Sequence, residues 1–316
     1  MRRVALIYNP ASGQHSSRRD LALQQVAEVL HQAGIGTELM ETQAPGSAGT
    51  LAQDAAARGC DTIIACGGDG TVHEVLQSVV GTDVALGVIP LGTANALAQN
   101  LGLGTSPVKA MHKLLTAEPV RVSVGRISYQ NGTPGAHTRY FTVAAGVGAD
   151  ALFLSRLDAR LKRRFGYALY LVEAMRVWAT HSFPLFEAAF EEPGSSSPRV
   201  VEISQLLAVR IRDFGGMLHN LAPGATLHND GLRLLAFKTR SRLQYSRFLL
   251  AVVFKRQTFN RQIELLDAVS VECRPRNGSL TRIFAEADGE LLGDLPVRIE
   301  IVPQAVNLLI PQNARP

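Results

Sequence analysis

Residues 61–76 read Asp61-Thr62-Ile63-Ile64-Ala65-Cys66-Gly67-Gly68-Asp69-Gly70-Thr71-Val72-His73-Glu74-Val75-Leu76. The apolar run from Thr62 to Cys66 predicts a buried strand, and residues Val72 to Val80 predict a helix that begins just after the glycines. Glycines without a Cβ atom let phosphate oxygens approach backbone N–H groups, and a helix start adds unpaired donors. The stretch therefore predicts a phosphate-binding loop between a strand and a helix.

The acidic residue in this loop, Asp69, needs an explanation of its own. A carboxylate among phosphate-binding groups would repel the ligand unless a cation or a proton transfer compensates for its charge. The alternative is a plain tight turn in which Asp69 caps the following helix. Taken alone, the loop leaves both interpretations open.

Two further polar loops follow predicted strands on either side. Asn9-Pro10-Ala11-Ser12-Gly13 comes after the strand Val4–Tyr8, and Pro90-Leu91-Gly92-Thr93-Ala94-Asn95 comes after the strand Val84–Ile89. Loops at the carboxyl ends of parallel strands share one edge of the sheet, where such sheets bind ligands. Thr42 and Thr93 offer hydroxyls for phosphate or ribose, and Asn95 is either a ligand contact or a helix-start residue. Three such loops predict one binding crevice.

The first third of the chain alternates strand and helix patterns with short connections, which predicts an α/β domain with a parallel sheet. From about residue 120 short β-like runs dominate, and they predict a mainly antiparallel β-sandwich domain. We expect the α/β domain over residues 1–122 and the β-rich domain over residues 123–302. Two helices interrupt the second half, at Leu161–Thr180 and Leu243–Arg256.

The composition narrows the class of protein only modestly. The 316 residues carry a net charge of +5, which suits nucleotide phosphates, an anionic membrane or a nucleic acid equally. The three cysteines have no metal-like spacing, so we expect buried thiols and a reducing cytoplasm. The longest apolar run, Phe248–Phe254, is too short to span a bilayer.

Taken together, the three loops resemble those of the diacylglycerol kinase catalytic family, which includes bacterial lipid kinases and sphingosine and ceramide kinases and is distantly related to NAD kinases. The second half carries three more stretches that resemble family motifs: Gly146–Asp150, Ala225–Leu232 and Glu286–Glu290. In that family the last strand, here Ala305–Ile310, returns to the first domain, so residues 303–316 are expected to complete it.

The resemblance implies an ATP-dependent lipid kinase that transfers the γ-phosphoryl group of ATP to a lipid hydroxyl. It implies Asp288 as the general base, Asp69 as its catalytic partner at the nucleotide, and Glu290 as a group that holds the nucleotide or its Mg²⁺. The alternative for Asp288-Gly289 is an ordinary hairpin turn. The implied nucleotide contacts are Asn9, Pro10, Ala11, Ser12, Gly13, Thr42, Gly67, Gly68, Asp69, Gly70, Thr71, Val72, His73, Thr93, Asn95 and Glu290.

A structural Mg²⁺ is implied at the Asp-Gly turn, held by the Asp230 carboxylate and the backbone carbonyls of Leu227 and Leu232. The alternative is a turn without an ion. The chain also departs from the family pattern, because Ala96 follows Asn95 where many bacterial members have an acidic residue. Ser123 stands where many members have an aspartate, so an acid that would extend the Mg²⁺ network is missing.

The expected partners are ATP and a lipid at a membrane surface, and no nucleic acid is expected. A homodimer is left open. The expected location is the cytoplasm, with peripheral attachment to a membrane. Arginine and lysine residues crowd residues 156–164 and could contact anionic lipid. Those that flank Phe248–Phe254 are more typical of a core-facing helix with a charged rim. Two rival functions remain: a kinase of a soluble substrate of the NAD-kinase type, and a catalytically silent nucleotide- or lipid-binding regulator.

Overall fold

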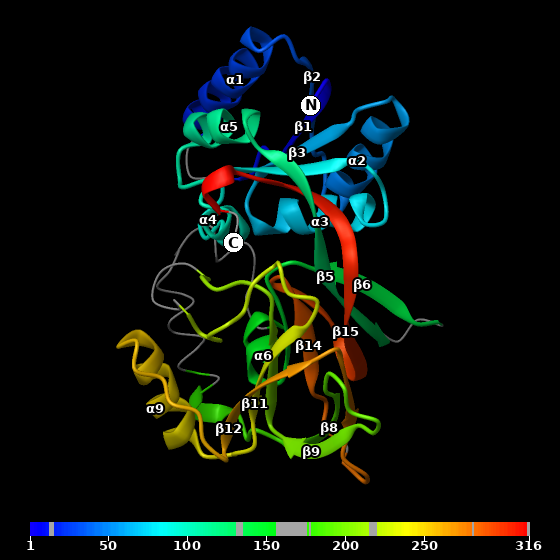
Figure 1. Cartoon of the computed structure of the whole chain (residues 1–316). Helices are drawn as coiled ribbons and strands as arrows, with labels where there is room; N and C mark the ends of the chain where they lie inside the picture. The colour runs from blue at the N-terminus through cyan, green and yellow to red at the C-terminus, as the bar shows by residue number, and fades with distance from the viewer. Residues whose placement is uncertain are drawn as a thin grey trace.

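The computed structural model describes residues 1–12, 16–130, 135–155, 176, 178–214, 220–279 and 281–314. These form two lobes, one above the other in Figure 1, with the N-terminus in the upper lobe. We call them the N-terminal lobe and the C-terminal lobe. No helix in the described part of the chain is both long enough and apolar enough to cross a membrane.

The N-terminal lobe is built on a parallel sheet with the strand order β4-β3-β1-β2. All six residues of β3 and of β4 are buried, as expected for strands covered by helices on both faces. Helix α1 packs against α5, and α2 packs against α3. The elements are β1 (Arg3–Tyr8), α1 (Ser16–Gln32), β2 (Gly36–Glu41), α2 (Ser47–Ala57), β3 (Thr62–Gly67), α3 (Asp69–Val79), β4 (Ala85–Pro90), α4 (Ala96–Asn100) and α5 (Pro107–Leu115).

The C-terminal lobe is a mostly antiparallel β structure with a second apolar core. Both halves of the predicted fold class are thereby confirmed. The elements are β5 (Glu118–Gln130), β6 (His137–Phe141), β7 (Ala144–Val147), α6 (Ala149–Ser155), β8 (Phe186–Glu191), β9 (Arg199–Ile203), β10 (Gln205–Val209), β11 (Leu232–Phe237), α9 (Arg242–Val253), β12 (Ile263–Ala268), β13 (Ser270–Pro275), β14 (Phe284–Ala287), β15 (Glu290–Ile310) and the short 3-10 helix η1 (Gln312–Ala314).

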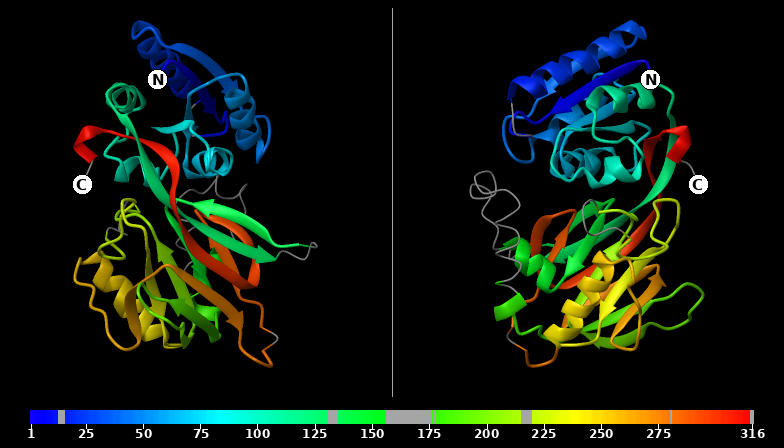
Figure 2. Two further views of the ribbon diagram at one scale, coloured as in Figure 1. Left: turned by 45° about the vertical axis from the view of Figure 1, so that its right-hand side comes forward. Right: turned by 90° about the vertical axis from the view of Figure 1, so that its left-hand side faces the viewer.

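Two long strands join the lobes. β5 and β15 pair antiparallel from Gln130 and Asp294 in the C-terminal lobe to Glu118 and Ile310 in the N-terminal lobe, and Figure 2 shows them running side by side between the lobes. The end of β15 also pairs in parallel with β4. This pairing supports our proposal that the first domain comprises residues 1–122 and 303–316, and the second residues 123–302.

The structure differs from the sequence-based expectations in several elements. Helix α5 was not predicted, although Pro107 at its start and the buried Ala110, Met111 and Leu114 are helix signals. The runs predicted as single strands, Val200–Val209 and Ile263–Val271, are each two strands that turn at Ser204 and Val269. The predicted helix Leu161–Thr180 lies outside the described residues except for residues 176 and 178–180.

Candidate active site

The three predicted loops lie at one edge of the parallel sheet. β1, β3 and β4 are neighbours and run in the same direction, so the loops that follow them begin at the same edge. In the first loop the Asn9 side chain accepts a hydrogen bond from the Ala11 N–H at 2.7 Å, and the Ser12 N–H donates to the Asn9 carbonyl at 3.0 Å. Gly13, the last predicted contact of this loop, lies outside the described residues.

The second and third loops are locked together. A Cβ atom on Gly92 would lie 2.4 Å from the Cα atom of Gly68, so the two backbones touch. Asp69 Oδ1 accepts the Ala96 N–H at 2.7 Å. Asn95, with φ of 48°, accepts the Gly92 N–H and donates to the Gly92 carbonyl, both at 2.9 Å. The side chain of Asn95 therefore closes its own loop, which favours its structural alternative over a ligand contact.

Helix α3 begins at Asp69, and no side chain of the described residues caps its N-terminus. A helix start without a capping side chain leaves N–H groups for an anion. A Cβ atom on Gly70 would meet nothing within 4 Å, and its φ is not positive, so packing does not require glycine there. A Cβ on Gly67 would lie 2.4 Å from Thr71 Oγ1, so Gly67 is required by the buried Thr71. Open space beside Gly70 suits a ligand at this helix start.

Burial raises the pKa of Asp69, and the negative charge of Asp288 raises it further, against the N–H groups of Ala96 and Leu97, which lower it. Asp69 and Asp288 come from different lobes. Their carboxylates therefore repel each other across the junction, and a cation between them would relieve that repulsion.

Asp288 and Gly289 form the turn of the β14–β15 hairpin, with φ values of 48° and 86°. Two positive φ angles are typical of the type I′ turn that Asp-Gly favours. The backbone of Asp288-Gly289 therefore forms an ordinary hairpin turn, and this turn also positions the Asp288 side chain. Asp288 Oδ1 accepts the N–H groups of Val143 and Ala144 at 2.9 and 3.0 Å, and Oδ2 accepts that of Thr142 at 3.0 Å.

His73 connects α3 to this hairpin across the lobe junction. Its Nδ1 lies 3.4 Å from Asp288 Oδ2 and its Nε2 lies 3.5 Å from Glu290 Oε2. Burial lowers the pKa of His73, but the hydrogen bond and charge of Asp288 and the charge of Glu290 outweigh burial, so the pKa is raised above 6.5. His73, implied above as a nucleotide contact, thus contacts both acids of the hairpin.

Behind the hairpin lies a pair of buried acids for which the sequence suggested no role. Among the described residues, neither carboxylate oxygen of Asp150 has a hydrogen-bond partner, and Glu286 accepts the Gly289 N–H at 2.9 Å. A Cβ atom on Gly146 would lie 1.7 Å from Asp150 and 2.9 Å from Glu286, so both carboxylates crowd this glycine. Burial raises the pKa of Asp150 to about 7, and burial with the charge of Asp150 raises that of Glu286 well above its usual range.

The remaining predicted contacts are less closely grouped. Val72 is buried in α3, and Thr93 is exposed in the third loop. Thr42 is buried at the end of β2, where its N–H donates to the Tyr8 carbonyl at 2.9 Å. Pro10 and Ala11 lie in the first loop beside Asn9. Of these residues, Thr93 offers an exposed hydroxyl group.

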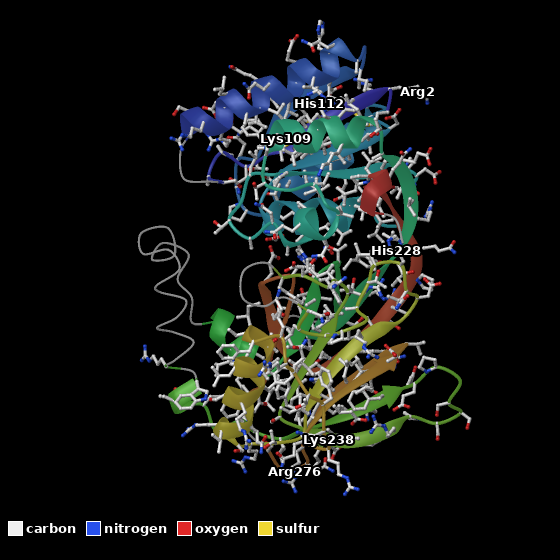
Figure 3. All side chains as sticks on the ribbon, turned by 60° about the vertical axis from the view of Figure 1, so that its left-hand side comes forward. Arg2, Lys109, His112, His228, Lys238 and Arg276 are labelled. Carbon is white, nitrogen blue, oxygen red and sulfur yellow. The ribbon has the colours of Figure 1, made fainter. Side chains whose placement is uncertain are left out.

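At the predicted metal turn, one of the two predicted carbonyl ligands, that of Leu227, accepts a hydrogen bond from a protein cation. The Leu227 carbonyl accepts a hydrogen bond from the Arg210 guanidinium at 3.1 Å. The Asp230 carboxylate accepts one from the Ser123 hydroxyl, and Leu232 is buried at the start of β11. His228 of this turn, labelled in Figure 3, lies at the level where the two lobes meet. A guanidinium among the ligand oxygens does not fit a divalent ion at this turn.

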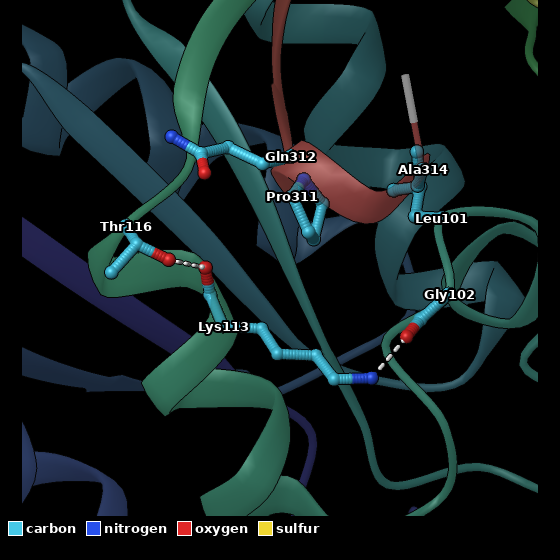
Figure 4. Close-up of a pocket in the computed structure, with 7 residues that line it drawn as sticks. All are labelled: Leu101, Gly102, Lys113, Thr116, Pro311, Gln312 and Ala314. Atoms are coloured by element: carbon cyan, nitrogen blue, oxygen red, sulfur yellow. Dashed lines mark hydrogen bonds between the residues drawn. The ribbon is translucent and has the colours of Figure 1, made fainter. Parts of the chain in front are cut away.

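Away from these loops, a small cavity of about 120 Å³ is lined by residues that follow α4, by the end of α5 and by C-terminal residues, including Leu101, Lys113 and Pro311. Figure 4 shows Lys113 reaching the Gly102 carbonyl across it. Ligand pockets for molecules of nucleotide size are roughly 300–1,000 Å³. The cavity is therefore too small to be a nucleotide site.

Comparisons with known proteins identify the family. Residues 3–127 match the diacylglycerol kinase catalytic domain, and residues 142–310 match the YegS C-terminal NAD kinase beta sandwich-like domain. A diacylglycerol kinase of Bacillus subtilis (strain 168) is 27% identical, over 99% of this chain and 97% of its own length. One of Mycobacterium tuberculosis is 29% identical, over 98% and 96%.

Solved structures agree on the fold. The crystal structure of a diacylglycerol kinase from Bacillus anthracis str. Sterne matches with a TM-score of 0.71 and 19% identity, covering 99% of this chain and 98% of that one. Yeast NADH kinase matches with a TM-score of 0.51 and 10% identity, covering 98% and 83%. At these identities the likeness is one of fold alone. With both family domains matched in order, the chain belongs to the diacylglycerol kinase catalytic family and is, at the level of that family, a lipid kinase.

Proposed function

We propose that this lipid kinase transfers the γ-phosphoryl group of ATP to the hydroxyl of a membrane lipid alcohol of the diacylglycerol or sphingosine class. The observation that carries the proposal is the meeting of the Asp69 loop with the Asp288-Gly289-Glu290 hairpin across the lobe junction, with His73 within 3.4–3.5 Å of both hairpin acids. Phosphoryl transfer depends mainly on positioning and charge neutralisation. This junction offers a helix start for phosphates and carboxylates for a metal or a proton.

In the proposed reaction, the Asp288 carboxylate accepts the proton of the lipid hydroxyl, and the oxygen of that hydroxyl forms a bond to the γ-phosphorus of ATP. The bond from that phosphorus to the bridging oxygen breaks, and ADP leaves. Three backbone N–H groups and His73 hold the carboxylate in one orientation. Such orientation is what a positioned base requires.

The nucleotide-associated metal fits the acids at the junction. Mg²⁺ is usually bound by one or two carboxylates together with substrate phosphates. Asp69, whose pKa is raised by burial and by Asp288, and Glu290, whose side chain is 41% exposed, would hold it. Bound there, a divalent ion would neutralise charge on the phosphates.

A surface on the C-terminal lobe suits a lipid bilayer. Helix α9 buries Tyr245, Phe248 and Val252, as the core-facing interpretation predicts. However, its rim is apolar as well as charged. Exposed apolar side chains on this surface are Leu243, Leu249, Leu250, Val253 and Phe254. The exposed cations around them are Arg240, Arg242, Arg247, Lys255 and Arg256. Apolar side chains ringed by cations match the interface of an anionic membrane. The basic segment 156–164, which was also expected to face lipid, lies outside the described residues.

The test is a kinase assay with labelled ATP and mixed micelles of diacylglycerol, sphingosine or ceramide, with NAD as a soluble acceptor. Label in a lipid product is expected. Label transferred only to NAD would overturn the lipid proposal, and ATP binding without transfer to any acceptor would favour a silent regulator.

Variants divide the roles among the acids. Asp288→Asn should lower kcat by about 10²–10⁴-fold with little change in the KM for ATP. The carboxylate of Asp288 accepts N–H groups at both of its oxygens, and an asparagine amide has only one oxygen. The Tm of the variant must therefore be measured as well. Asp294→Asn on β15, paired with Arg282, is the matched control. Asp69→Asn keeps an acceptor for the Ala96 N–H and should abolish turnover. Loss of ATP binding in Asp288→Asn would show a nucleotide or metal ligand instead of a base.

A further inference from the structure

Arg210 is a fully buried cation at the junction of the lobes. Only 1% of the residue is exposed. It follows β10, and its own N–H donates to the Val143 carbonyl at 2.9 Å. Its guanidinium reaches two separate segments of the chain: β5, through Ser123, and the turn of residues 227–231.

The guanidinium is bonded to four backbone carbonyls. Nη1 donates to Asn229 at 2.9 Å and to Gly231, and Nη2 donates to Ser123 at 2.9 Å and to Leu227 at 3.1 Å. Three of these carbonyls belong to the turn that was expected to hold a structural Mg²⁺. Carbonyl oxygens that converge on one point need a cation or several N–H donors, and a guanidinium supplies both.

The charge of this arginine is compensated locally. Burial lowers the pKa of Arg210 to about 10, against the negative charge of Asp230, so the guanidinium stays cationic near neutral pH. Asp230 also accepts the Ser123 hydroxyl, and that hydroxyl accepts the Gln304 N–H at 3.1 Å. Arg210, Ser123 and Asp230 thus connect the turn to β5 and β15, the two strands that join the lobes.

A divalent ion at this turn would compete directly with Arg210. It would need the Leu227 carbonyl, which already accepts an N–H, and it would stand beside a buried positive charge. Mg²⁺ also demands oxygens at about 2.0–2.1 Å in octahedral geometry. With Ser123 in place of an aspartate, the turn lacks a second acid to balance two cations.

We propose that Arg210 is a built-in cation that replaces a structural divalent ion at the 227–232 turn, and that it fixes this turn to β5 at the lobe junction. Arg210 is then a positioning residue, and the stability of the protein does not depend on a metal at this turn. The inference concerns the junction alone and does not rest on the nature of the lipid.

The first test follows thermal unfolding of the wild-type protein without nucleotide, in a chelator and with excess Mg²⁺ or Ca²⁺. We expect the same Tm in all three. Asp230→Asn and Asp69→Asn locate any ion that does stabilise the protein. A saturable rise in Tm that Asp230→Asn abolishes would overturn the proposal, whereas a rise that persists in Asp230→Asn but not in Asp69→Asn places the ion at the nucleotide loops and supports it.

The second test exchanges the cations. Arg210→Met keeps an apolar stem but takes the guanidinium from four carbonyls, of which those of Ser123 and Leu227 are buried, and should lower Tm by about 5–15 °C. Arg210→Lys keeps the charge but not the planar set of donors, so it should fall in between. The double variant Ser123→Asp, Arg210→Ala makes room and supplies an acid, and its Tm should rise with Mg²⁺. Wild-type stability in Arg210→Met, or no Mg²⁺ response in a folded double variant, would contradict the replacement.

Discussion

The glycines of the candidate active site differ in what occupies the space where a side chain would be. At Gly92 a Cβ atom would meet the backbone of Gly68 at 2.4 Å and Asn95 Oδ1 at 2.9 Å, whereas at Gly70 it would meet nothing within 4 Å. Backbone atoms cannot move aside as the end of a flexible side chain can. Packing between two loops therefore requires glycine at position 92, whereas packing of the described residues does not require it at position 70.

We expect Gly92→Ala to separate the second and third loops. Overpacking of this kind typically costs about 1–3 kcal/mol. Tm should fall accordingly, and kinase activity should fall further because the Ala96 N–H would lose its place on Asp69. Gly36→Ala is the control, since its Cβ would lie 3.7 Å from the Arg2 carbonyl, an ordinary contact. An active, fully stable Gly92→Ala protein would refute the proposed contact.

The buried acids give a prediction for pH. The folded pKa of Asp150 is about 7 and its ordinary value is 3.8, so the fold favours the protonated carboxyl. Its contribution to stability is complete below pH 3.8 and is lost as pH rises from there through about 7. Asp150→Asn should remove this loss and raise the free energy of unfolding at pH 8 by on the order of 4 kcal/mol. Denaturant unfolding at several pH values measures it.

The control is Asp83→Asn, because the Asp83 side chain is fully exposed. It should leave the pH dependence of unfolding as it is in the wild type. If Asp150→Asn were less stable than the wild type at pH 8, the ionised Asp150 carboxylate would have a stabilising partner, contrary to the geometry described here.

At the scale of elements, the β14–β15 hairpin and helix α9 each combine two functions. The Asp-Gly turn reverses the chain and also carries the Asp288 carboxylate to three N–H groups of the segment that enters β7. Helix α9 packs on the C-terminal core with one face and leaves Leu250 and Phe254 57% and 70% exposed. An exposed apolar rim costs solubility unless it has a partner. That is why we propose this rim as the surface that contacts the membrane.

Leu250→Glu combined with Phe254→Glu should weaken binding to vesicles that contain anionic lipid by about ten- to a hundredfold, since each apolar side chain contributes roughly 1.5–3 kcal/mol when fully buried. Activity on the same vesicles should fall in parallel, while activity on a dispersed short-chain lipid should persist. The matched control adds the same two charges elsewhere, by Leu21→Glu on helix α1 combined with Leu39→Glu on β2, where these leucines are 56% and 51% exposed. Equal loss of binding in the control would assign the effect to net charge.

At the scale of the whole molecule, the lobes are joined by β5, by β15 and by polar contacts at the junction. His73 is the contact that responds to pH. Its pKa is raised above 6.5 when folded, because Asp288 and Glu290 favour the charged ring more than burial disfavours it. The stabilisation is therefore complete below pH 6.5 and is lost as pH rises through the folded pKa.

His73→Gln should remove this dependence. As pH rises from 6.5 through the folded pKa of His73, the wild type should lose more free energy of unfolding than the variant. His31→Gln, a change at an exposed histidine of α1, should behave like the wild type. Parallel curves for the wild type and His73→Gln would mean that folding does not shift the pKa of His73.

What the sequence determined by itself is local. Apolar runs and glycines specified the strands and helices of the N-terminal lobe and the three loops at one sheet edge, because periodicity and backbone freedom act over a few residues. The Asp-Gly hairpin and the change to β structure near residue 120 could be predicted for the same reason. Helix α5 could also have been read from its proline and apolar spacing.

Tertiary structure alone decided how these parts meet. His73 and Asp288 are 215 positions apart, and Arg210 and Ser123 are 87 apart. Whether Asn95 contacts a ligand or closes a loop, and whether the 227–232 turn holds an ion or a guanidinium, depends on which groups are buried together. Burial is a property of the whole packed chain. Most buried polar groups form hydrogen bonds, and their partners can come from any part of the chain that the fold brings near. No local pattern records that choice.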